Sequence, residues 1–267
     1  MPARIPMTAK QREALLALPM TEEEVIAHHS LDENERAAIA RLRSPANQLG
    51  YALQLCCLRF PGRYLRRGEL LPAIMLDHVA EQIDVDADVI ADFAKRGPTR
   101  YEQLASIKRN HGFVDLTHPV RAELKQWLEA EALSCTDGRL LLERLIARMR
   151  ERKIIIPGVS VIERLTASAM HAADAKVASE ILAQLNTEQK AKLNAVLDDK
   201  THAQQSRLSW LREPPIRVGA RGLFELLDKI DYIRRLGIGE LALPDYLKLR
   251  LSQLAREGVR YTAQALQ

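Results

Sequence analysis

The chain has only three cysteines, few aromatic residues (4%) and no long apolar run, and these shortages exclude several classes of protein. Two of the cysteines, Cys56 and Cys57, are adjacent, so we expect no disulfide framework, and a reducing cytoplasm fits best. No stretch approaches the roughly 18 apolar residues that would predict a membrane-spanning helix. The N-terminal residues also lack the apolar core of a secretory signal. We therefore expect a cytoplasmic protein.

Motifs for the common catalytic chemistries are missing as well. The sequence contains no GxxxxGK[ST] phosphate loop, no GxGxxG turn after a strand and no nucleophile elbow. The adjacent His28 and His29 cannot ligate one metal from a single helix face, and no other spacing is typical of a metal site. We expect no metal, no cofactor and no catalytic residue in these 267 residues, and hence a chain that is not itself an enzyme.

Abundant Ala, Leu, Arg and Glu favour helices, so the predicted fold class is all-α with helix-turn-helix-like units. Turn-forming residues between Phe113 and Pro119 suggest two helical domains, at 1–115 and 119–267. Capping residues and apolar periodicity predict helices over residues 8–18, 21–29, 32–42, 45–60, 72–83, 86–95, 99–112, 119–132, 137–153, 160–170, 172–185, 188–198, 203–212, 219–236 and 244–257.

Positive charge is concentrated in one stretch. The net charge is +4, but residues 1–133 carry 17 bases and 19 acids, for −2, and residues 134–267 carry 22 bases and 16 acids, for +6. Within the acidic half, the stretch Arg41–Arg67 has six arginines and no acid. Clustered cations on an ordered helix suit a nucleic-acid surface. The alternative is a solvated arginine face on an ordinary helical domain.

The helix predicted over residues 45–60 divides this stretch into two faces. Ser44 is the expected N-cap, with Pro45 at the first helical position. One side is expected to face a core, and it carries Leu49, Leu53, Cys56 and Phe60. The other is expected to reach base edges, and it carries Asn47, Gln48, Tyr51 and Gln54. A helix, a tight turn and a second helix with an exposed polar face form the helix-turn-helix outline, which also occurs in many other helical proteins.

Two further helix–turn–helix arrangements follow. Residues 95–109 contain five bases and one acid around a short turn, although cations near a helix C-terminus are favourable in any protein. Residues 137–165 repeat the arrangement, with an apolar stripe over 137–153 and Ser160 near the start of the second helix. Such a stripe is more often core than a binding groove.

Four sequence segments indicate a protein family, which helical periodicity alone cannot do. The run ANQLGYALQLCCLRFPGR (Ala46–Arg63) resembles a segment near the N-terminus of the Tn-three family of replicative transposases. IIIPGVSVIERL, LSWLREPP and LAREGVRYTAQ are similar to later segments of the same region, in the same order. The resemblance extends over essentially all of the chain.

The resemblance carries expectations about function. It implies that this helical region binds the terminal inverted repeats of a transposon, and that an acidic triad on an RNase-H-like domain far beyond it cuts DNA with divalent metal. The chain would be a fragment or a stand-alone relative that binds double-stranded DNA, on the bacterial nucleoid, without cleaving it. It also allows self-association within a transposase assembly.

Charge and helix geometry, not the resemblance, select the residues expected to contact DNA. They are Arg41, Arg43, Asn47, Gln48, Tyr51, Gln54, Arg59, Arg63, Arg66, Arg67, Lys95, Arg96, Thr99, Arg100, Lys108, Arg109, Arg150, Arg152, Lys153 and Ser160. The alternative function is a protein-interaction or regulatory module of the transposition complex, served by the apolar stripes at 137–153 and 219–236. An RNA-binding role is disfavoured because the chain lacks an aromatic stacking platform.

Overall fold

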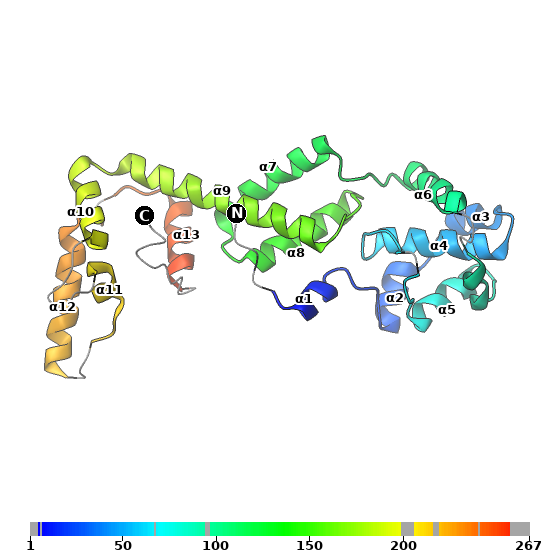
Figure 1. Cartoon of the computed structure of the whole chain (residues 1–267), viewed down its shortest axis with the longest axis horizontal. Helices are drawn as coiled ribbons and strands as arrows, with labels where there is room; N and C mark the ends of the chain where they lie inside the picture. The colour runs from blue at the N-terminus through cyan, green and yellow to red at the C-terminus, as the bar shows by residue number, and fades with distance from the viewer. Residues whose placement is uncertain are drawn as a thin grey trace. The chain divides into compact units, whose positions relative to one another are not determined.

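The protein is all-α, as predicted. A computed structural model describes residues 5, 7–66, 68–93, 97–198, 206–215, 219–239 and 241–256, and in these ranges it contains no β-strand beyond an isolated bridge between Val114 and Ile154. The helices are α1 (Ala9–Ala14), α2 (Glu22–His29), α3 (Glu33–Ala40), α4 (Pro45–Arg59), α5 (Ala73–Gln82), the 3-10 helix η1 (Ala87–Asp92), α6 (Gly97–His111), α7 (His118–Ser134), α8 (Gly138–Glu151), α9 (Val159–Gln184), α10 (Thr187–Asp198), α11 (Arg207–Arg212), α12 (Ala220–Arg235) and α13 (Asp245–Arg256) (Figure 1).

Local capping chemistry explains where the early helices begin. The side chains of Thr21, Asp32 and Ser44 each accept a hydrogen bond from the backbone N–H three residues later, as the sequence predicts. Pro45 occupies the first position of α4, where no N–H is needed. The Ser44 cap therefore starts α4 directly after a short turn that follows α3.

The chain divides at a different place from the one predicted. The two compact units are Met1–Met170 and His171–Gln267, and α9 runs through the division as one helix where two were expected. No Gly or Pro interrupts the Ala-rich residues around 171. The predicted boundary at 113–119 lies inside the first unit because Phe113 is buried and Val114 exchanges backbone hydrogen bonds with the 153–155 strand-like segment.

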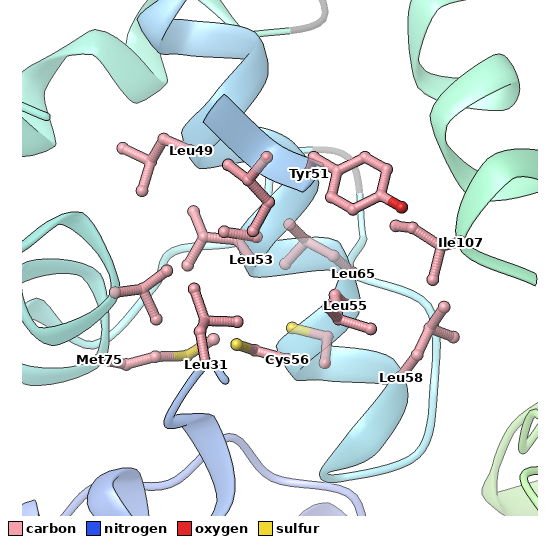
Figure 2. Packing of buried hydrophobic residues seen from close by; sticks show 14 of the residues in the cluster. Leu31, Leu49, Tyr51, Leu53, Leu55, Cys56, Leu58, Leu65, Met75 and Ile107 are labelled. Carbon is pink, nitrogen blue, oxygen red and sulfur yellow. The ribbon is translucent and has the colours of Figure 1, made fainter. Parts of the chain in front are cut away.

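The core of the first unit is built around α4. This helix lies among α2, α3, α5, η1 and α6 (Figure 1). The predicted core residues Leu49, Leu53 and Cys56 are fully buried. Figure 2 shows side chains from before α3 and from α5, such as Leu31 and Met75, gathered around them. Because neighbours cover it on all sides, α4 is the central helix of the unit and not an exposed recognition helix.

One glycine of α4 is required by close packing. The ring of Phe93, which follows η1, occupies the space where a side chain on Gly50 would stand, at 2.1 Å from the position of a Cβ. Any larger residue at position 50 would displace this ring. The Phe93 ring at the end of η1 therefore fits against α4 by shape.

The second unit buries two charged side chains and exposes several apolar ones. Lys229 of α12 is only 5% exposed; its ammonium donates to the backbone oxygen of Glu213, pairs with Glu225 and lies over the Trp210 ring. Arg250 of α13 is also buried and pairs with Asp174. In contrast, the apolar side chains of α12 are exposed by 41–67%, namely Leu223, Phe224, Leu226, Leu227, Ile230 and Ile233.

Replacing Leu53 by Ala is expected to lower the free energy of unfolding by about 2–5 kcal/mol, because it leaves a cavity in the fully buried centre of α4. Urea denaturation followed by circular dichroism measures the change. Leu70→Ala is the control, since Leu70 is 94% exposed and should leave the midpoint almost unchanged. Equal effects of the two substitutions would contradict the central position of α4.

Candidate nucleic-acid interface

The structure shows that the amide face predicted on α4 is buried. Gln54 is fully buried and its amide donates to the side chain of Gln103 on α6, at 2.9 Å. Tyr51 is 5% exposed, and its ring lies beside Ile107 (Figure 2). These two residues cannot contact a base, and their predicted role was wrong.

The remaining amides of this face serve the N-terminus of α4. The side chain of Gln48 donates to the backbone oxygens of Ala40 and Leu42, at 3.3 and 3.0 Å. The backbone oxygen of Asn47 accepts from Gln103 at 3.0 Å, and the Asn47 side chain is half-buried. Gln48 thus fixes the α3–α4 turn, which corrects its predicted role in base contact.

A signal in the sequence could have revealed this burial. The residues between the two proposed faces, including Ala52, Leu55, Cys57 and Leu58, are also apolar. A helix that is apolar on all sides is expected to be buried on all sides. The two-face division of α4 gave too much weight to the four side chains of the predicted polar face in a helix that is apolar from Leu55 to Leu58.

Arg59 and Arg63, at the end of α4, bind the protein itself. Arg59 donates to the Ser30 backbone oxygen at 2.7 Å and pairs with the Glu35 carboxylate. Arg63 is 7% exposed and donates to the Leu16 backbone oxygen at 2.9 Å and to the Glu69 carboxylate. Both guanidinium groups are therefore occupied, and their predicted phosphate contacts are withdrawn.

The carboxylate of Glu69 responds to this pairing. Burial favours its neutral form, but hydrogen bonds from the Arg63 side chain and the Arg66 backbone N–H outweigh burial and lower its pKa. Glu69 is therefore ionised at neutral pH and holds Arg63 in place. The Arg63–Glu69 ion pair joins two positions of the loop that follows α4.

Arg150 of α8 is also an internal residue. It donates to the backbone oxygen of Pro61 at 2.9 Å, and its guanidinium carbon lies 4.4 Å from the centre of the Phe60 ring. His28 stacks on the same ring, with centroids 4.2 Å apart. Burial lowers the pKa of Arg150. The residue ties α8 to the end of α4, so its predicted DNA contact is also withdrawn.

Four other predicted cations are engaged with their own unit. Arg100 donates to the backbone oxygen of Leu65, and Lys108 to Asp115 at 2.8 Å. Arg152 pairs with Glu123 at 2.8 Å, and Lys153 donates to the His111 backbone oxygen at 3.0 Å. The hydrogen bond from Arg152 lowers the pKa of Glu123. These partners reduce the charge available for a phosphate.

The other predicted residues differ in accessibility. Arg41, Arg43, Arg66, Arg109 and Ser160 are exposed, and Thr99 is half-buried in the first turn of α6. Within the described part of the chain, the side chains of Arg41, Arg43 and Arg109 have no hydrogen-bond or ion-pair partner. Ser160 lies in the first turn of α9, where its backbone oxygen accepts from Arg164. Arg67, Lys95 and Arg96 lie outside the described residues.

Arg41 and Arg43 lie at the end of α4 that Gln103 of α6 contacts, and Arg109 lies farther along α6, two residues before His111. The contact of Gln103 with Asn47 holds α6 against the start of α4, and Gln48 holds the turn that carries Arg41 and Arg43 at the same end. The buried side of α6 carries Gln103 and Ile107, so its opposite side is exposed. We name this region the turn–α6 surface; it comprises Arg41, Arg43, Tyr101, Glu102, Ala105, Ser106 and Arg109.

Four members of the turn–α6 surface were not predicted from the sequence: Tyr101, Glu102, Ala105 and Ser106. Tyr101 is 74% exposed. Their positions follow from helical periodicity once Gln103 and Ile107 are known to be buried. On this helix the sequence pattern selected Thr99 and the cations Arg100, Lys108 and Arg109, and left these four residues out.

Burial shifts the pKa values of His111 and Cys56 in the first unit. Burial, together with Arg59 and Lys153, lowers the pKa of His111 although the Glu35 carboxylate is 3.7 Å away, so this histidine is neutral at pH 7 and adds no cation. Burial raises the pKa of the Cys56 thiol to about 12, so it is not a ready nucleophile.

Among the described residues, no three His, Cys, Asp or Glu side chains are grouped to hold a metal ion. No described helix combines the length and apolarity that crossing a bilayer requires.

Comparisons with known proteins cover nearly the whole chain. Residues 7–169 match the family model described as "Domain of unknown function (DUF4158)". The chain is 30% identical to the transposase for transposon Tn21 of Escherichia coli over 266 residues, and 26% identical to the transposase for transposon Tn1546 of Enterococcus faecium over 257 residues. These matches include 98% and 96% of this chain but 26% of each relative, so the chain spans about a quarter of their length. The predicted resemblance to transposases is confirmed.

Arg63→Ala is expected to destabilise the fold by about 3–5 kcal/mol, because it leaves the half-buried Glu69 carboxylate and the Leu16 backbone oxygen without their partner. Urea denaturation measures the loss. Arg41→Ala, which removes an exposed arginine, is the control and should leave the midpoint unchanged. If both variants were equally stable, Arg63 would not be the internal residue described above.

The contribution of Glu69 should also depend on pH. Because the folded-state pKa of Glu69 is lowered, its contribution to stability is present above the ordinary value of 4.5 and is lost as the pH falls through the folded-state pKa. The stability difference between the original protein and Glu69→Gln should therefore shrink as the pH is lowered from 7 through that range. A difference that stayed constant would contradict the lowered pKa.

Proposed function

We propose that this chain, which belongs to the DUF4158 family, binds double-stranded DNA at the ends of a transposon and contributes recognition, not strand cleavage. Its relatives are bacterial transposases, and the chain is similar to them over nearly all of its own residues. The observation that carries the proposal is the turn–α6 surface, where Arg41 and Arg43 are exposed on the turn before α4 and Gln103 holds α6 against the start of α4. Such binding would place the protein on the nucleoid.

The role of the two turn arginines follows from their position. Arg41 and Arg43 are exposed on the short turn between α3 and α4, which the Ser44 cap and Gln48 hold in shape. A guanidinium on a fixed turn suits phosphate oxygens. Phosphate contacts orient a protein on the duplex without reading its sequence. Arg41 and Arg43 therefore serve as positioning contacts.

Replacing Arg41 and Arg43 together by Ala is expected to weaken binding to every duplex, and to reduce the slope of log affinity against log salt by about 2, since each phosphate contact contributes about 0.9 to that slope. Fluorescence anisotropy with a duplex of the transposon end and a scrambled duplex, at several salt concentrations, measures both effects.

The control for this test is the double variant Lys10→Ala and Arg121→Ala, which removes the same charge from exposed positions on α1 and α7. It should leave the slope almost unchanged. Equal losses in the two double variants would mean that net charge alone, and not the turn, determines binding. No binding to either duplex by the original protein would refute DNA binding itself.

A second candidate function rests on α12. The predicted stripe at 137–153 is intramolecular core, since Leu141, Leu145 and Met149 are fully buried. The stripe at 219–236 is exposed, and Leu223, Leu226, Ile230 and Ile233 follow the spacing of a two-helix seam. In an antiparallel pair of such helices, the leucines of one copy face the isoleucines of the other. We propose that α12 pairs with α12 of a second copy.

Ile230→Glu is expected to abolish this self-association, because it places a charge in the middle of the seam. Analytical ultracentrifugation over a range of concentrations measures the mass. Asp228→Glu, an exposed change on the other side of α12, is the control and should leave the association intact. A monomeric original protein at all concentrations would contradict pairing through α12.

A further inference from the structure

The exposed face of α6 has a composition that cations alone do not explain. Tyr101, Ala105 and Arg109 follow one another at four-residue intervals along it. At a rise of about 1.5 Å per residue, the distance from Tyr101 to Arg109 is about 12 Å along the helix axis. This length matches about three to four base-pair steps of roughly 3.4 Å. The exposed face of α6 is therefore long enough to contact about three to four consecutive base pairs.

The middle of this face is shallow. Ala105 and Ser106 are small, whereas Tyr101 and Arg109 project on either side of them along the helix. Small side chains in the centre let the helix approach the floor of a groove closely. An alanine methyl can contact the methyl group of thymine, and a serine hydroxyl can bond to any base edge. This profile suits entry into the major groove, which is about 12 Å wide.

Glu102 is the informative residue. It is exposed on the same face, and within the described part of the chain its carboxylate has no ion-pair partner. A carboxylate opposite phosphates would weaken binding by repulsion. In the major groove, however, a carboxylate is the natural acceptor for the amino group of cytosine. An exposed acid on the same helix face as Arg109 therefore fits a surface that reads bases, and is unfavourable on one that contacts only phosphate.

Resting on the proposed DNA binding, we infer that the exposed face of α6 reads bases in the major groove, with Glu102 selecting a cytosine and Arg109 a guanine. Arginine pairs with the guanine edge through two parallel hydrogen bonds. Glu102 and Arg109 are seven residues apart, or about 10 Å along the axis, so the two selected bases lie about three base pairs apart. Arg41 and Arg43 supply the flanking phosphate contacts.

The test is selection from a pool of duplexes with about 30 randomised base pairs, followed by sequencing of the bound fraction. The original protein should enrich one consensus. Glu102→Gln should lose the cytosine preference at one position, and Arg109→Ala the guanine preference about three base pairs away. The discrimination at each position should fall roughly five- to hundredfold. The turn double variant should keep the consensus and lose affinity.

Glu81→Gln is the matched control, because it removes an exposed acid from α5 and should leave the consensus intact. Urea midpoints of all variants should agree with that of the original protein, which shows that they fold. If Glu102→Gln kept the consensus and bound every duplex more tightly, Glu102 would only repel phosphate and the inference would be wrong. If the original protein enriched no sequence and bound no duplex, the proposed function itself would be wrong.

Discussion

Burial of α4 from Leu49 to Leu58 is the constraint on which the first unit depends. Neighbouring elements cover this helix on every side, so its few polar side chains must find partners inside. Gln54 does so by bonding to Gln103, and Gln103 in turn bonds to the backbone of Asn47. These bonds fix which side of α6 faces the core. The hydrogen bonds between α4 and Gln103 thus determine which side chains of α6 are exposed. These include an acid, a hydroxyl and an arginine.

The arginines of the first unit divide into two groups with different physical roles. Arg59, Arg63 and Arg150 donate to backbone oxygens of turns and termini that no helix or sheet would otherwise satisfy. A guanidinium suits this use because its five donors spread over a fork. Only the second group, which includes Arg41 and Arg43, remains available at the surface. Residues 1–133 have a net charge of −2, yet the exposed Arg41 and Arg43 give them a local cationic site.

Sequence reasoning was reliable where the determinants are local. The caps at Asp32 and Ser44, the all-α class and the core side of α4 depend on neighbouring residues, and all were confirmed. The burial of Tyr51 and the continuity of α9 were missed, although the apolar residues around α4 and the absence of Gly or Pro near residue 171 fit both. Counting arginines could not reveal the site either, because a bound and a free guanidinium look alike in a sequence. What separates Arg63 from Arg41 is a carboxylate and a carbonyl brought close by the fold.

The second unit differs from the first because it buries charged side chains and exposes apolar ones. This difference suggests that the two units have separate roles. In α12 a lysine is buried, with Glu225 and Trp210 around it, while a leucine and isoleucine stripe faces outward. A buried ion pair stabilises little beyond the cost of removing its charges from water, so the Lys229–Glu225 pair gives α12 little stability. Exposed apolar area of this kind is favourable only when another surface covers it. The turn–α6 surface and the α12 stripe rest on different cores, and a substitution that disables one should leave the other able to act.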